Sequence, residues 1–134
     1  MGEFQPVPHT ADVSLEVKGK DVPDLMETAA RGMFSLITNI SAIKPEKEIE
    51  VKVEGEDYED LLVRWLNELL YLHSQGYVFS YFRIEKLSKN FLQAKAKGEK
   101  LKPHHTLNLE IKAATYHNLK IAGKPPKATI VFDV

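Results

Sequence analysis

The side chains best suited to catalysis or metal binding fall in four short groups of this 134-residue sequence. Each group combines histidine, tyrosine or carboxylate groups, and the four are His9 with Asp12, His104 with His105, Tyr116 with His117, and Asp133 with Val134. Hard divalent cations prefer several oxygen ligands that converge on one point. Asp12, Asp133 and the free carboxylate of Val134 supply three such ligands, whereas histidines suit transition metals. The first chemistry that the sequence suggests is therefore a metal site.

Each of these groups also has a plainer interpretation. Asp12 on the outward face of a strand is typical of a solvated carboxylate. His104 and His105 are typical of an exposed loop, and adjacent side chains of an extended chain point in different directions, which argues against both binding one ion. Asp12, Glu110 and Asp133 could instead converge as carboxylates for acid–base chemistry. The sequence contains no P-loop, GxGxxG, HExxH or GxSxG motif, so those nucleotide, zinc and serine-nucleophile sites are not expected.

Alternating sequence patterns at the two ends of the chain would position the acidic residues. Residues 10–18 alternate apolar and polar side chains, and so do residues 127–134, which predicts a half-buried strand at each end. Asp12 and Asp133 fall on the polar faces of these strands. They can share an ion only if the first and last strands of the fold lie side by side.

Two amphipathic helices are predicted between these strands. The longer one covers residues 57–75, carries the only tryptophan of the chain, Trp65, and has an N-cap at Asp57 and a stop at Gly76. The other begins near Pro23 and ends near Thr38, with an apolar residue every three or four positions. Both apolar stripes must be buried against the rest of the chain.

The remaining elements give an α+β fold. Strands are expected at 48–54, 77–87, 91–97 and 106–115, while residues 1–8 are expected to form a short arm because proline occurs twice there. Strict alternation indicates that one face of each strand is covered. We therefore predict two helices packed on one face of a mostly antiparallel sheet of six or seven strands, in a single domain spanning residues 1–134.

Composition indicates a soluble globular protein. The chain has no cysteine, no apolar run long enough to span a bilayer and no signal-peptide pattern at its start, so we expect a cytoplasmic protein that does not engage membranes. Residues 1–60 hold 6 basic against 14 acidic residues, and residues 81–134 hold 11 against 4. This asymmetry fits either interleaved halves that neutralise each other or a basic surface for RNA. We favour interleaving, because the basic residues are scattered.

Four segments together resemble the archease family. They carry the His-Thr-Ala-Asp start, the apolar helix around its tryptophan, a Glu-Ile-Lys-Ala-Ala-Thr-Tyr-His-Asn-Leu stretch and an acidic terminus, at residues 9–13, 61–70, 110–119 and 132–134. The resemblance spans nearly the whole chain. The segment His104–Thr106 matches less closely than its neighbours.

The resemblance to archeases implies a non-enzymatic protein cofactor. Members of the family assist an RtcB-type RNA ligase in tRNA splicing, promote guanylylation of the active-site histidine of that ligase, restore its multiple turnover and can broaden its nucleotide use. The implied partners are the ligase and, through it, tRNA halves and GTP. The family also carries an older interpretation as a chaperone-like modulator of tRNA-modifying enzymes.

The resemblance also implies site residues. A divalent cation, which could be calcium, manganese or magnesium, is assigned to Asp12, Asp133 and the terminal carboxylate of Val134. Supporting positions that match the family motifs are His9, His105, Lys112, Tyr116 and His117.

Two other functional classes use the same features. A small metal-dependent hydrolase of nucleotides or phosphoesters would need the same acidic residues. An RNA-binding or chaperone module would use the basic C-terminal half.

Overall fold

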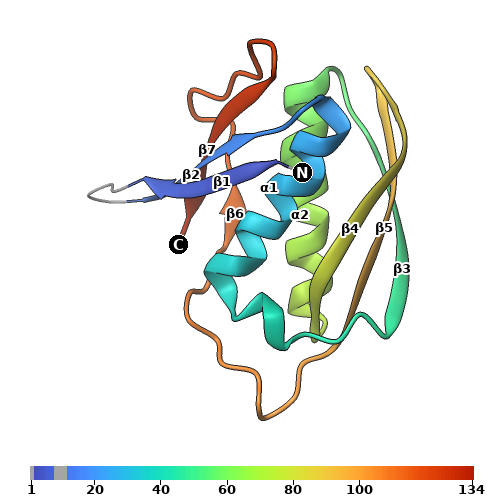
Figure 1. Ribbon diagram of the computed structural model, residues 1–134, viewed down its shortest axis with the longest axis vertical. Helices are drawn as coiled ribbons and strands as arrows, with labels where there is room; N and C mark the ends of the chain where they lie inside the picture. Colours follow the sequence, from blue (N-terminus) through green and yellow to red (C-terminus); the bar gives the residue numbers. More distant parts are fainter. Residues whose placement is uncertain (1, 8–11) are drawn as a thin grey trace.

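Two helices lie between two antiparallel sheets in the computed structural model, which describes residues 2–7 and 12–134 (Figure 1). The elements are β1 (Glu3–Val7), β2 (Val13–Lys18), α1 (Val22–Ile37), a short 3-10 helix (Ile40–Ala42), β3 (Lys47–Glu54), α2 (Tyr58–Ser74), β4 (Tyr77–Ser88), β5 (Phe91–Lys100), β6 (Ala113–Ala114) and β7 (Lys127–Asp133). The α+β class, the two helices and the number of strands confirm the prediction. The strands form two sheets, however, and each sheet covers the helix pair from one side.

Helix α1 has the limits that its sequence predicts. Asp21 is the N-cap, and its carboxylate accepts a hydrogen bond of 2.9 Å from the amide of Asp24. Pro23 stands in the first turn, where its missing N–H costs nothing. The helix ends at Ile37 with Thr38 as C-cap, and its apolar stripe is fully buried.

Helix α2 joins the layers through its tryptophan. Asp57 caps its start by accepting from the amide of Asp60 at 2.8 Å, and Gly76, with a φ of 99°, follows its end. The Trp65 ring is fully buried, and its Nε1 donates to the carbonyl of Met26 on α1 at 3.0 Å. Within the described part of the chain, neither helix is long and apolar enough to cross a membrane.

The three-stranded sheet, in the order β3-β5-β4, brings the acidic and basic halves of the chain together. Lys95 and Lys97 on β5 both lie within ion-pairing distance of Glu48 on β3, at 3.6 and 3.9 Å. Lys95 also lies 3.6 Å from Glu85 on β4. The outer face of this sheet is therefore a mixture of both charges, which supports the interleaved interpretation of the charge asymmetry.

The four-stranded sheet, in the order β1-β2-β7-β6, pairs the two ends of the chain. Strand β2 runs antiparallel to β7, with Leu15 opposite Ile130 and Val13 opposite Phe132. Leu15, Ile130 and Phe132 are buried in the core, whereas Glu16 and Asp133 face outward. The strand order thus brings the first predicted strand beside the last one, as a shared ion requires.

The prediction of a short arm at the start of the chain is wrong. Residues Glu3–Val7 form β1, and Pro6 lies opposite Leu15 of β2. Proline is tolerated because β1 is an edge strand, where one side needs no amide donor. A rule that treats proline as a strand breaker fails at such an edge.

The predicted strand at residues 106–115 is only partly formed. It pairs with β7 only at Ala113 and Ala114, and an isolated bridge joins Leu107 to Thr38. The rest of the segment belongs to no strand in the described structure. The alternating pattern predicted Leu107, Leu109 and Ile111 to face inward, but of these only Ile111 is buried and Leu107 is exposed. The pattern also carried no information about a partner strand.

Candidate functional site

The paired ends of β2 and β7 form the candidate metal site. Val13 lies opposite Phe132 in the last regular pair of these strands, and continuing the register by one residue sets Asp12 opposite Asp133. Both side chains belong to the outward face of the sheet. Directly opposed like charges destabilise a sheet, and a bound cation relieves that repulsion. The donor set of carboxylate oxygens fits a hard divalent cation.

Lys112, a supporting residue within the described part of the chain, is joined to this site by a backbone hydrogen bond. Its amide donates to the carbonyl of Asp133 at 2.8 Å, and the next residue, Ala113, pairs with Asp133 across β6 and β7. The Lys112 side chain is exposed, as are Asp133 and Val134. His9 lies outside the described residues.

Tyr116 is hydrogen-bonded to the start of α2. Its hydroxyl donates to Oδ1 of Asp60, whose carboxylate also accepts from the Nε of Arg64 at 3.0 Å. The hydrogen bond from Tyr116, followed by the one from the Glu56 amide, lowers the pKa of Asp60, and the same contact with Asp60 raises the pKa of Tyr116. Tyr116 therefore anchors its loop to a helix end.

The loop that carries His117 has a second attachment to the same helix end. The amide of Ile121 donates to Oε2 of Glu59 at 3.0 Å. His117 is exposed between these two attachments, and Asn118 after it has a φ of 50°. The loop thus presents the His117 ring to solvent from a fixed base.

His105 is buried, so the expectation of an exposed loop histidine is wrong for this residue. Its side chain is fully buried, with Nδ1 2.9 Å from the amide of Lys102 and Nε2 3.1 Å from Oε2 of Glu99. Because the Lys102 amide donates to Nδ1, the neutral ring carries its proton on Nε2 and donates to Glu99. His105 therefore fixes the loop after β5. The adjacent His104 is exposed, as expected.

Glu99 and the two adjacent histidines form a group with metal-binding spacing. Ligand atoms of Glu99, His104 and His105 lie within 4.8 Å of one another, so they could hold an ion. Both nitrogens of the His105 ring are already engaged, however, and a metal would have to displace one of these hydrogen bonds. The existing hydrogen bonds give this group a structural role, which is to hold the loop after β5. The carboxylates at the β2–β7 end would bind a cation without breaking such bonds.

Glu99 is strongly stabilised in its charged form. The amide of Lys44 donates to its Oε2 at 2.7 Å, and the ammonium of Lys102 lies 2.9 Å from its Oε1. These contacts, with that of the Lys44 amide the largest, lower the pKa of Glu99 from 4.5 to about 2.

We expect Glu99 to make the stability of the fold depend on acidic pH. Because its folded pKa is depressed, its contribution is complete above its unfolded pKa of 4.5 and is lost as the pH falls toward 2. The difference in free energy of unfolding between the protein and a Glu99→Gln variant should therefore shrink across this range. Urea denaturation at several pH values measures this difference, and a value that stays constant would contradict the assignment.

Asn67 is a supporting residue that the sequence did not reveal. Its side-chain amide donates to the carbonyl of Ala114 at 3.2 Å, and its Oδ1 accepts from the Ala114 amide at 2.8 Å. It thereby holds β6 against α2, and β6 in turn pairs with β7 beside Asp133. The only available signal was a polar residue directly after Trp65 and Leu66, and the charged Glu68 beside it made this signal weak.

Comparison with known proteins gives consistent matches over the whole chain. The model of the Archease protein family (MTH1598/TM1083) matches residues 4–134. The archease of Pyrococcus furiosus is 40% identical, over 93% of this chain and 92% of its own length. That of Sulfurisphaera tokodaii is 39% identical, over 100% of this chain and 99% of its own length.

Solved structures have the same fold. The solution structure of protein 1598 from Methanobacterium thermoautotrophicum superposes with a TM-score of 0.80 at 30% identity and covers 98% of each chain. The crystal structure of a Thermotoga maritima archease, described as a possible chaperone, gives a TM-score of 0.64 at 26% identity, covering 97% of this chain and 96% of that one. With the family match and these relatives, the chain belongs to the archease family.

Proposed function

We propose that this protein is a non-enzymatic cofactor that activates an RtcB-type RNA ligase during tRNA splicing in the cytoplasm. It promotes guanylylation of the active-site histidine of the ligase, restores multiple turnover and broadens the nucleotides that the ligase accepts. Membership of the archease family supports this proposal. The structural observation that supports it is the pairing of β2 with β7, because continuing its register by one residue beyond Val13 and Phe132 would set Asp12 opposite Asp133.

In this proposal the two aspartates hold a divalent cation together with the terminal carboxylate of Val134. Calcium, manganese and magnesium all accept such oxygen donors. When bound, the cation supplies positive charge for triphosphate oxygens. Lys112, which is exposed beside Asp133, adds a second positive charge at the same end of the sheet.

The exposure of this end supports a role in reaching into a partner. Asp133 and Val134 are exposed at the end of β7, so they can enter a nucleotide pocket of the ligase. His9 belongs to the same motif as Asp12, and His117 is presented to solvent by a loop that Tyr116 anchors. His105 acts indirectly in this scheme, by holding the loop that precedes β6.

A ligation assay with limiting ligase tests the proposal. Purified ligase is mixed with excess RNA halves and GTP, with and without this protein. We expect joined RNA to remain no more than equimolar with the ligase when the protein is absent and to exceed it several-fold when the protein is present. Equal yields with an active ligase would contradict the proposal.

Two alternatives predict different outcomes in the absence of ligase. A hydrolase would turn over nucleoside triphosphates with Mn²⁺ on its own. A chaperone-like role, for which the description of the Thermotoga maritima relative is the specific support, would show as protection of a tRNA-modifying enzyme from aggregation. The cofactor proposal expects no nucleotide turnover by the isolated protein.

A further inference from the structure

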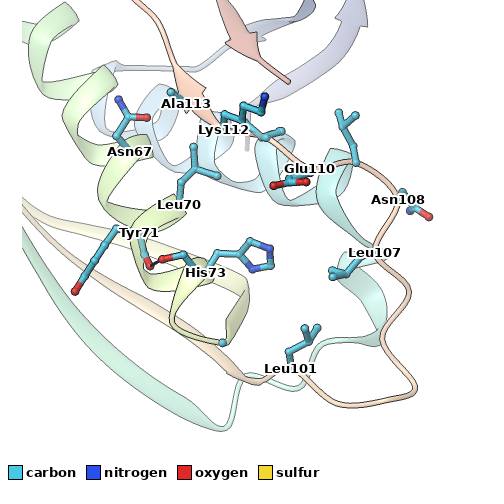
Figure 2. Close-up of a pocket in the computed structure, with 14 residues that line it drawn as sticks. Asn67, Leu70, Tyr71, His73, Leu101, Leu107, Asn108, Glu110, Lys112 and Ala113 are labelled. Carbon is cyan, nitrogen blue, oxygen red and sulfur yellow. Dashed lines mark hydrogen bonds between the residues drawn. The ribbon is translucent and has the colours of Figure 1, made fainter.

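A large groove lies between α2 and the segment of residues 107–113, and its lining reaches Lys112 and Ala113 beside the β7 end. Its volume is about 920 Å³, and Figure 2 shows residues of α2 on one side and of the extended segment on the other. Leu70 and Tyr71 contribute from α2, and Leu107 from the opposite wall. Tyr71 is 57% exposed and Leu107 is 51% exposed, so large apolar groups face solvent here.

The wall formed by residues 107–112 has the sequence of a strand but no neighbouring strand. Apolar residues alternate strictly with polar ones, and Ile111 is buried whereas Lys112 is exposed. Only Ala113 and Ala114, which follow, join a sheet. This wall is therefore an open edge.

Backbone hydrogen bonds show which side of this edge is open. The amides of Asn108 and Lys112 donate to the carbonyls of Ile37 and Asp133, at 2.7 and 2.8 Å. In an extended chain, successive amides point to opposite sides, so the amides of residues 107, 109 and 111 point away from β7. Within the described structure these three amides have no hydrogen-bond partner. Water or a bound chain must satisfy them.

Asn67 shows that this edge accepts a strand-like partner. Its side-chain amide both donates to and accepts from the backbone of Ala114, as a peptide group of a neighbouring strand would. The Asn67 side chain pairs with the backbone of Ala114 alone. The groove begins directly beside it, because Asn67 and Ala113 both line it.

We propose that the groove binds an extended segment of another protein by strand addition to residues 107–111. The unpaired backbone groups call for a polypeptide, since they alternate at the spacing of a strand. The apolar walls suit side chains at alternate positions of the guest. Glu110 and Lys112 carry opposite charges on the rim, which offers no preference for a phosphate backbone. The proposal is independent of ligase activation.

Amide hydrogen exchange measured by NMR tests this proposal without any ligase. The probe is a blocked seven-residue peptide in which valine alternates with threonine between terminal lysines. In the free protein, we expect the amides of Leu109 and Ile111 to exchange faster than those of Asn108 and Lys112. At ten times its dissociation constant, the peptide should slow exchange of Leu109 and Ile111 about tenfold. A peptide methylated on alternate backbone nitrogens should lose this effect.

Variants of exposed apolar residues identify the surface. Leu107→Asp should weaken peptide binding at least about tenfold, because it places a charge on the apolar wall. Tyr81→Asp is the matched control, since Tyr81 is 41% exposed on β4 and should leave binding unchanged. The proposal fails if Leu109 and Ile111 are already protected in the free protein, if the peptide protects neither, or if protection appears with protein concentration alone, which would indicate a second copy as occupant.

Discussion

Replacing Asp12 with alanine is expected to abolish activation of the ligase while leaving the protein folded. Asp12 directly precedes β2 and lies outside the core, so its removal costs little packing. It would, however, remove one of the proposed oxygen donors. Loss of groups that merely orient metal ligands lowers affinity about 10–100-fold, so loss of a direct ligand should lower it more than about 100-fold. Calorimetric titration with Ca²⁺, Mn²⁺ and Mg²⁺ measures this effect.

Glu16→Ala provides the matched control for this experiment. Glu16 is an exposed carboxylate on the same face of β2, opposite Thr129 rather than Asp133. It changes the net charge by the same amount but is remote from the proposed ligands. Both variants should unfold at nearly the same denaturant concentration as the unaltered protein. Full ligase stimulation by folded Asp12→Ala would reject the role of this carboxylate.

Replacing Trp65 with alanine is expected to cost about 3–5 kcal/mol of the free energy of unfolding. The Trp65 ring is fully buried, packs edge-to-face against Phe82 at a centroid distance of 6.1 Å and donates to the carbonyl of Met26. Its truncation leaves a cavity where α1, α2 and β4 meet. Domains of this size have about 5–15 kcal/mol of stability in total, so the loss is a large share.

Far-UV circular dichroism is the appropriate readout, because Trp65 is the only tryptophan and its fluorescence disappears in the variant. Tyr71→Ala is the control on the same helix. Tyr71 is 57% exposed, so its truncation should change stability by less than about 0.5 kcal/mol. A loss below about 1 kcal/mol for Trp65→Ala would mean that the surrounding core collapses into the space.

The helices and their limits could be predicted because their signals are local. Asp21 and Asp57 act as N-caps through the amides three residues later, and both helices bury the stripe that their periodicity indicates. These interactions involve neighbours in the sequence. No knowledge of the tertiary arrangement was needed to find them.

Sheet membership could not be predicted, because alternation shows which face of a strand is buried but not which strand lies beside it. One sheet was therefore expected where two are present. The same limitation explains the segment at 106–112, whose pattern is strand-like although it lacks a partner. The prediction of an arm around Pro6 failed for another reason. Whether a strand lies at the edge of a sheet, where proline is tolerated, depends on the strand order.

Only part of the candidate site could be predicted from the sequence. The pairing of the ends that carry Asp12 and Asp133 followed from requiring a shared ion, and β2 does pair with β7. The metal itself stays a prediction. The contacts of Asn67 and Asp60 involve residues far away in the sequence, which no local pattern encodes. The bond of His105 to Glu99 spans only six residues, but no sequence pattern indicated it.

The pairing of β2 with β7 has a consequence for biosynthesis. More than 100 residues separate β2 from β7 along the chain, so the sheet that joins them cannot close until β7 has been made. A nascent or prematurely terminated chain lacks one of the two aspartates and the strand that aligns them. A chain that stops before β7 therefore cannot form the paired β2–β7 end or the metal site proposed there.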